Sequence, residues 1–100
     1  MTDVCQIAEF ASMATQVEGA PVVHAPPIFE QTVSVTGVST QSAPFGATTR
    51  VLRVHTTQVC CLTFGANPVS VSPTNFIMAI NQTEYIRVNP GDKVAVIVFV

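Results

Sequence analysis

The stretch Phe29-Glu30-Gln31-Thr32-Val33-Ser34-Val35-Thr36 decides the fold class, because its side chains alternate in character with a period of two. The odd positions are mostly apolar, whereas the even positions are polar. This alternation is typical of a β-strand with one face toward a core and the other toward water. We therefore predict a strand over 29–36 whose dry face holds Phe29, Gln31, Val33 and Val35.

The segments that follow continue the pattern of short strands and turns. Residues 37–46 are rich in Ser, Thr, Gln, Pro and Gly, which indicates a polar loop. The segments 48–57 and 59–64 are both extended in character and are separated by a turn near Gln58, so we predict that they form a hairpin. The residues of this pair that we expect on the core face are Cys60, Leu62 and Phe64.

The C-terminal part contains the clearest turn and the most apolar strand. Asn89-Pro90-Gly91-Asp92 has Pro and Gly at its two central positions, as a type II turn requires. The run 94–100 is apolar throughout, so both faces of this strand must be covered. We expect its second face to pack under the N-terminal segment or against a neighbouring subunit. Shorter strands are predicted over 76–80 and 84–88.

Residues 1–27 show no sustained period of two or of 3.6. The spacing of Ile7, Phe10, Ala11 and Ala14 would fit a short helix over 7–15, which would be marginal without a partner. We interpret 1–27 as an N-terminal arm or edge segment and 28–100 as the folded domain. The fold prediction is all-β: a small β-sandwich or jelly roll of about six to eight short strands with an extended N-terminal arm.

Composition narrows the possible partners. Charged residues make up 10% of the 100-residue chain and hydrophobic residues 48%, so much of the surface is expected to contact protein. The net charge is −2 and no basic run is present, which argues against nucleic acid. The longest apolar run is too short to span a bilayer, and acidic residues occupy the N-terminal stretch where a signal peptide would have basic ones. We expect no membrane partner and a soluble, unsecreted chain.

The sequence lacks motifs for catalysis, metal binding or nucleotide binding. His24 and His55 are the only histidines, and neither belongs to a ligand motif. The three cysteines are an odd number, and Cys60 and Cys61 are adjacent, so we expect reduced, buried thiols. The five glycines are scattered singly, which argues against a phosphate loop. We predict that the protein is not an enzyme and has no cofactor and no metal site.

Three segments resemble a group of small tailed-bacteriophage virion proteins. They are Phe64-Gly65-Ala66-Asn67-Pro68, Gln82-Thr83-Glu84-Tyr85-Ile86-Arg87-Val88 and Pro90-Gly91-Asp92-Lys93-Val94-Ala95-Val96-Ile97, within about residues 50–98. The resemblance implies a β-sandwich structural protein made in the host cytoplasm and located on the capsid surface. Such a capsid decoration or cement protein would bind the major capsid protein and bridge its subunits.

We expect the subunit contacts at the two ends of the chain and favour a homotrimer. Two alternatives remain open: a neck or tail component of the same particle, whose interfaces would be head-to-tail, and a carbohydrate- or receptor-binding module, which would need an exposed pocket near Tyr85. The predicted interface residues are Ile7, Phe10, Pro26, Pro27, Phe99 and Val100. Ordinary core packing within one subunit is the competing interpretation of the same residues.

Overall fold

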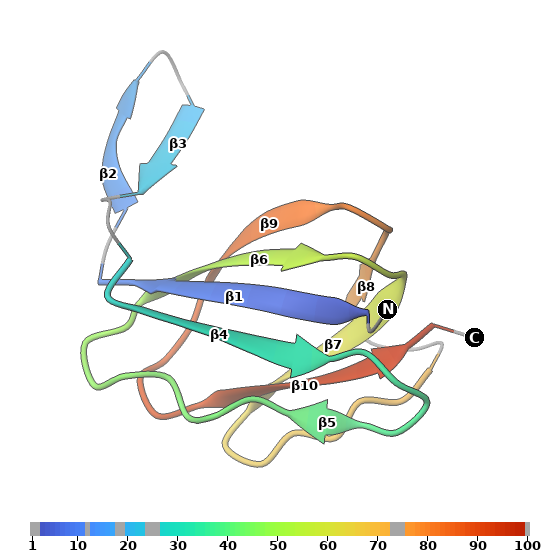
Figure 1. Ribbon diagram of the computed structural model, residues 1–100. Coiled ribbons are helices and arrows are strands. Elements are labelled where there is room, and N and C mark those ends of the chain that lie inside the picture. The colour runs from blue at the N-terminus through green and yellow to red at the C-terminus, as the bar shows by residue number, and fades with distance from the viewer. Residues whose placement is uncertain (1–2, 12, 18–19, 24–26, 73–75, 100) are drawn as a thin grey trace.

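The structure is a computed structural model of the chain, and it describes residues 3–11, 13–17, 20–23, 27–72 and 76–99. These ranges form ten β-strands, which are arranged as two four-stranded sheets and one two-stranded sheet (Figure 1). The two larger sheets pack face to face, and all their strand pairs are antiparallel. The predicted all-β sandwich is therefore confirmed. No helix within the described ranges is long and apolar enough to cross a membrane.

The first sheet has the strand order β4-β1-β6-β9. Its strands are β4 (Phe29–Ser34), β1 (Val4–Phe10), β6 (Val51–Thr56) and β9 (Thr83–Arg87). The second sheet has the order β5-β10-β7-β8. Its strands are β5 (Thr40–Gln41), β10 (Lys93–Val98), β7 (Cys60–Gly65) and β8 (Phe76–Met78).

The core lies between these two sheets and follows the period-two pattern of the sequence. Val33 and Val35 are buried, whereas Thr32 and Ser34 are exposed, as the alternation over 29–36 predicts. The prediction is wrong for Phe29, which begins β4 at the end of the sheet and is 50% exposed. On β7, the predicted core face is also confirmed. The buried core cluster comprises Cys5, Ile7, Val33, Val35, Phe45, Leu52, Val54, Cys60, Leu62, Met78, Val88, Val94 and Val96, with Phe64, Ile86 and Val98 packed against it.

The predicted hairpin of 48–57 with 59–64 is wrong, because β6 and β7 belong to different sheets. The chain turns at Thr56, whose hydroxyl donates to the Gln58 carbonyl at 2.7 Å and accepts from the Gln58 amide at 3.2 Å. The next strand then enters the opposite layer. Both strands still direct apolar side chains into one core, so their sequence pattern is the same as that of a hairpin.

The N-terminal segment also differs from its prediction. β1 is a central strand of the first sheet, paired with β4 on one side and β6 on the other. Val4–Phe10 is therefore part of the sandwich rather than of an arm, and residues 7–10 are strand rather than helix. The separate element is the two-stranded sheet of β2 (Met13–Val17) and β3 (Ala20–Val23).

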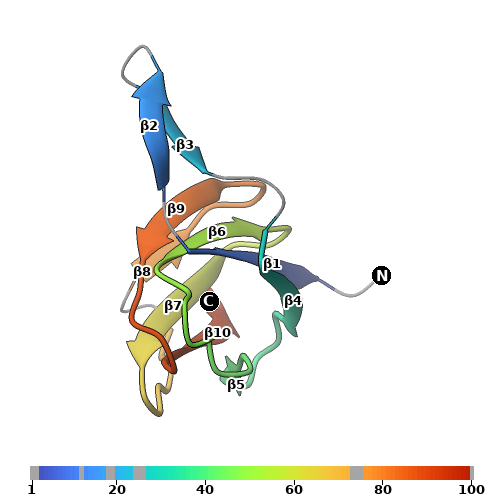
Figure 2. The same cartoon turned by 90° about the vertical axis from the view of Figure 1, so that its left-hand side faces the viewer.

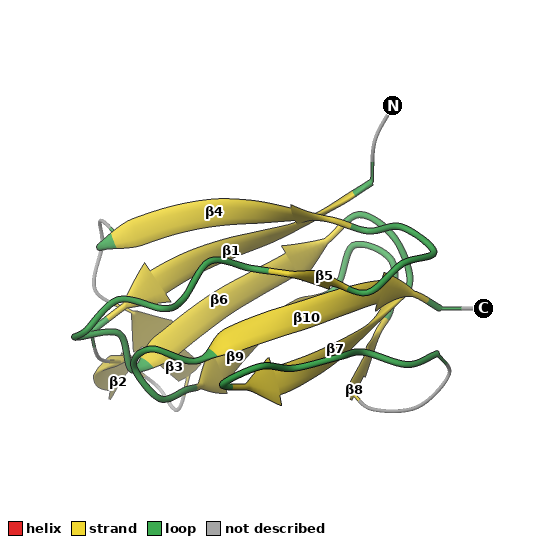
Figure 3. Cartoon of the chain, turned by 90° about the horizontal axis from the view of Figure 1, so that it is seen from below, coloured by secondary structure: helices red, strands yellow, loops and turns green. Residues whose placement is uncertain are grey.

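The outer face of β10 is covered by the chain itself. The Ser70 hydroxyl lies 2.8 Å from the Ala95 carbonyl oxygen and 3.1 Å from the Cys61 carbonyl oxygen, so the loop after β7 closes over the second sheet (Figure 3). Ala95 and Cys61 are fully buried as a result. The prediction that both faces of this strand are covered is confirmed at Ala95, but a loop supplies the cover, not the N-terminal segment.

The predicted type II turn before β10 is present. Gly91 has a φ of 84°, and the Asp92 amide donates to the Asn89 carbonyl at 3.3 Å. A positive φ at the third position of the turn is easily adopted only by glycine, which explains its place there. The turn sets the start of β10 opposite the end of β7, where Lys93 is paired with Gly65.

Candidate interaction surfaces

The first candidate surface is the β2–β3 hairpin. Its strands pair with each other and with neither larger sheet. It rises from one end of the sandwich, on the outer side of the first sheet (Figure 2). β1 and β4 are antiparallel neighbours, with Glu9 paired to Phe29, so the hairpin is an insertion into the connection between two adjacent strands. Neither β2 nor β3 contains a charged residue.

Apolar residues surround the base of this hairpin. Phe10 and Val51 are cross-strand partners and are both buried, although their neighbours in the strands place them on the outer face of the first sheet. Ile28 and Phe29, where the chain returns from the hairpin, are about half exposed, at 51% and 50%. They line a shallow hollow of about 310 Å³ together with Pro44, Gly46, Thr48 and Thr49.

A buried carboxylate holds this end of the sandwich together. Glu9 is fully buried, and its Oε1 accepts hydrogen bonds from the Thr49 hydroxyl at 2.7 Å and from the Gly46 amide at 2.9 Å. Its Oε2 accepts a hydrogen bond from the side-chain amide of Gln31 at 3.2 Å. Buried carboxylates require such donors, so Glu9 has a structural role in fixing the loop before β6 against β1 and β4.

The second candidate surface is an apolar region at the β8 edge and the C-terminal end of the second sheet. Ile77, Cys61 and Ile97 form one cross-strand row, in which Ile77 is exposed and Cys61 is buried. Phe99 follows β10, donates its amide to the Val59 carbonyl at 3.0 Å and exposes its ring. The other exposed apolar residues on β8 and its flanking loops are Val69, Val71, Phe76 and Ile80.

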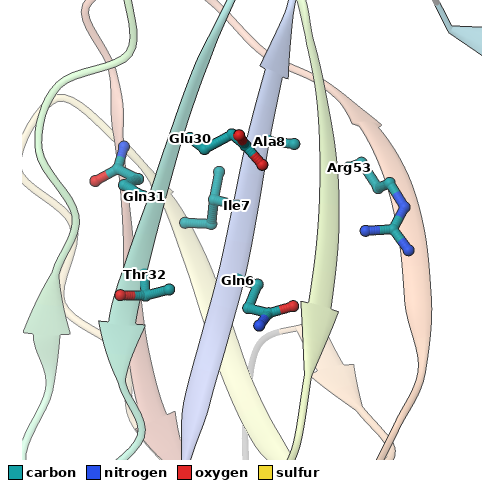
Figure 4. Close-up of a pocket in the computed structure, with 7 residues that line it drawn as sticks. All are labelled: Gln6, Ile7, Ala8, Glu30, Gln31, Thr32 and Arg53. Carbon is teal, nitrogen blue, oxygen red and sulfur yellow. The ribbon is translucent and has the colours of Figure 1, made fainter. Parts of the chain in front are cut away.

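The third candidate surface is a polar hollow of about 450 Å³ on the outer face of the first sheet. It lies over β1 and is lined by Gln6, Ile7, Ala8, Glu30, Gln31, Thr32 and Arg53 (Figure 4). Figure 4 shows the Glu30 carboxyl group beside Ala8 and the Arg53 guanidinium group extending from β6 toward β9. The two charged residues therefore come from the strands on either side of β1.

The thiols and the described histidine have ordinary structural surroundings. All three cysteines are free and buried. Burial, with a smaller effect of the nearby Cys60 thiol, raises the pKa of the Cys5 thiol to about 12, and burial also raises the pKa of Cys60. His55 Nδ1 lies 2.7 Å from the Thr83 hydroxyl. Within the described ranges, His, Cys, Asp and Glu form no cluster of three or more suited to a metal ion.

The structure separates the predicted interface residues into different environments. Ile7 is buried in the core between the two sheets, so core packing, the competing interpretation, describes it. Phe10 is also buried, but on the outer face of the first sheet. Pro27 is half-buried and Phe99 is 40% exposed, which leaves both accessible to a partner. Pro26 and Val100 lie outside the described residues.

The apolar β8 edge, the polar hollow and the buried Glu9 were not predicted from the sequence. Phe76-Ile77-Met78 is three apolar residues in succession, and this signal could have indicated a short strand with one uncovered side. The hollow left no comparable signal, because its residues come from three strands. Comparisons of the chain with family models, with curated proteins and with solved structures found no match.

Proposed function

We propose that the protein is a structural component of a tailed-bacteriophage virion, a decoration or cement protein that binds the outer head lattice and bridges neighbouring major capsid subunits. The main support is the β2–β3 hairpin, which extends from the sandwich and whose two strands contain no charged residue. An isolated two-stranded ribbon is at best marginally stable in water. Packing on a protein partner would stabilise it.

A bridging protein needs two separate contact regions, and the molecule offers them. The hairpin leaves one end of the sandwich, whereas the C-terminal end of β10, with Phe99, lies at the other end (Figure 1). Ile28 and Phe29 beside the base of the hairpin and Phe99 at the other end expose apolar side chains, and burial of such surface contributes roughly 25 cal/mol per Å² before the costs of association. Contacts at both ends would resist the separation of two capsid subunits.

The same features support a homo-oligomer on the capsid, and we favour a trimer. A trimer around a three-fold axis would present three copies of both contact regions to the lattice. The three free cysteines are consistent with synthesis in the reducing cytoplasm of a host.

Binding to phage heads that lack the protein tests this proposal. We would compare the wild type with a variant in which residues 12–26 are replaced by Gly-Ser-Asn-Gly, which joins β1 to its neighbour β4 directly. The control is Val38→Ser, which removes an exposed side chain outside both contact regions. We expect wild type and control to co-sediment with heads and the hairpin variant to bind at least about tenfold more weakly. Equal binding of all three, or no binding by the wild type, would overturn the proposal.

A further inference from the structure

The polar hollow lies in a cross-strand row that spans the whole first sheet. Glu30, Ala8, Arg53 and Tyr85 are successive register partners on β4, β1, β6 and β9. In this row the small Ala8 side chain lies beside the Glu30 carboxyl group, and the Arg53 side chain lines the hollow from β6 (Figure 4). The neighbouring row places Thr32 beside Gln6, so polar groups border the hollow on more than one side.

The polar side chains around the hollow are not used to hold the fold together. Gln6, Glu30 and Thr32 are exposed, and Arg53 is half-buried. None of these four side chains makes a hydrogen bond or an ion pair with the described part of the chain. Gln31, which faces the opposite side of β4, behaves differently: its side chain bonds Glu9 and both backbone groups of Ala43.

The charges restrict the ligand that would fit this hollow. Glu30 would repel an anionic ligand and Arg53 would repel a cationic one. Gln6 and Thr32 each offer both a donor and an acceptor, whereas Arg53 only donates and an ionised Glu30 only accepts. A neutral ligand with several groups that both donate and accept satisfies all four side chains. Hydroxyl groups have this property.

An aromatic ring continues the same surface. Tyr85 is 42% exposed and is the register partner of Arg53 on the edge strand β9. Two strand spacings separate Ala8 from Tyr85, a distance of roughly 10 Å. This distance exceeds the width of a single sugar ring, so a ligand that contacts both residues must contain linked rings. The apolar face of a sugar ring would pack on the phenol ring.

We propose that the outer face of the first sheet binds a neutral oligosaccharide, with one ring over Ala8 between Glu30 and Arg53 and a further ring on Tyr85. This binding site is separate from the hairpin and from the apolar β8 region. It does not require the role on the capsid. The competing occupant is a second copy of the chain: a two-fold axis parallel to β1 would place Glu30 of one copy opposite Arg53 of the other.

Amide shifts of the labelled full-length chain test the proposal. We would record ¹H–¹⁵N correlation spectra with maltotriose, cellotriose and chitotriose as neutral probes and with sialyllactose as the anionic control. We expect at least one neutral probe to shift the amides of Gln6, Ala8, Arg53 and Tyr85 together. Ala8→Leu should fill the hollow and weaken that binding at least tenfold, and Val38→Ser should leave it unchanged.

Several results would overturn the proposal. The first is no shift with any neutral probe, followed by no signal on an array of neutral glycans. The second is binding that Ala8→Leu does not change while its spectrum shows an intact fold. The third is a stronger response to sialyllactose. The last is a homodimer in sedimentation equilibrium that Glu30→Lys dissociates, because this face would then be occupied by a second copy.

Discussion

The hydroxyl of Thr49 donates a 2.7 Å hydrogen bond to the fully buried carboxylate of Glu9. This bond joins the central strand of the first sheet to the loop that precedes β6. The Gly46 amide and the Gln31 side chain complete the set of donors around the same carboxylate. The cluster therefore closes the end of the sandwich from which the hairpin leaves.

Removal of this carboxylate should destabilise the protein strongly. Glu9→Ala leaves the Gly46 amide and the Thr49 hydroxyl without their acceptor and opens a cavity, so we expect the free energy of unfolding to fall by about 3 kcal/mol. Urea denaturation followed by circular dichroism measures the change. Glu30→Ala, on the exposed face of the adjacent strand, is the control and should change stability by less than about 0.5 kcal/mol. Similar values for the two variants would contradict the structural role of Glu9.

The raised thiol pKa values predict a loss of stability in alkali. The pKa of Cys5 is raised by burial from an ordinary value of 9.0 to about 12 in the folded protein. Between these two values the unfolded chain releases a proton that the folded protein retains, so stability falls as pH rises through this window. At about pH 10 the contribution of this one thiol is a loss of about 1 kcal/mol.

Denaturation of wild type and Cys5→Ala at several pH values between about 8 and 10.5 isolates this effect. The difference in the free energy of unfolding between the two proteins should shrink as the pH rises, because only the wild type contains the buried Cys5 thiol. A difference that stays constant with pH would show that the Cys5 thiol titrates normally in the folded state.

Gly91 should be sensitive to substitution because of its backbone conformation. Its φ of 84° is strained for any residue with a Cβ, although a Cβ there would meet no atom within 4 Å. We therefore expect Gly91→Ala to lower the melting temperature and cost about 1 kcal/mol of backbone strain. Gly37→Ala is the matched control, because Gly37 also has open space but no positive φ. Equal melting temperatures for the two variants would be inconsistent with the type II turn.

Excision of the β2–β3 hairpin should leave the sandwich folded. Its strands share no ladder with either large sheet, and the ends of β1 and β4 that it joins are already side by side. Replacement of residues 12–26 by Gly-Ser-Asn-Gly should therefore change the free energy of unfolding by less than about 2 kcal/mol. Thermal melts monitored by circular dichroism provide the measurement. Loss of cooperative unfolding would mean that the hairpin is part of the core structure.

Much of the sandwich could be predicted from sequence where local chemistry dictates local structure. The alternation at 29–36 indicates a half-buried strand, and Pro90-Gly91 requires a particular turn. β1 was not predicted because one of its inward-facing positions holds the charged residue Glu9. A buried carboxylate needs hydrogen-bond donors, and those of Glu9 come from residues 22 to 40 positions away in the sequence. The placement of β6 and β7 in different sheets also depends on packing, because a strand in either sheet can direct its apolar side chains into the shared core.

The candidate surfaces were less predictable than the fold. Phe99 and Ile7 were both expected at an interface. Phe99 is exposed, whereas Ile7 is buried in the core of its own subunit. The polar hollow depends on the register of β4, β1 and β6, which brings Glu30, Ala8 and Arg53 into one row. Register is a tertiary property, so no short segment of the sequence contains this information.

The most direct test of the proposed role is the number of copies of this chain in purified phage particles, measured by quantitative mass spectrometry against the major capsid protein. A decoration protein that bridges capsid subunits must be present in a number of the same order as the capsid protein itself, and this is the result that we predict. A few copies per particle would place the chain in the neck or tail, and its absence from the particle would contradict a structural role in the virion.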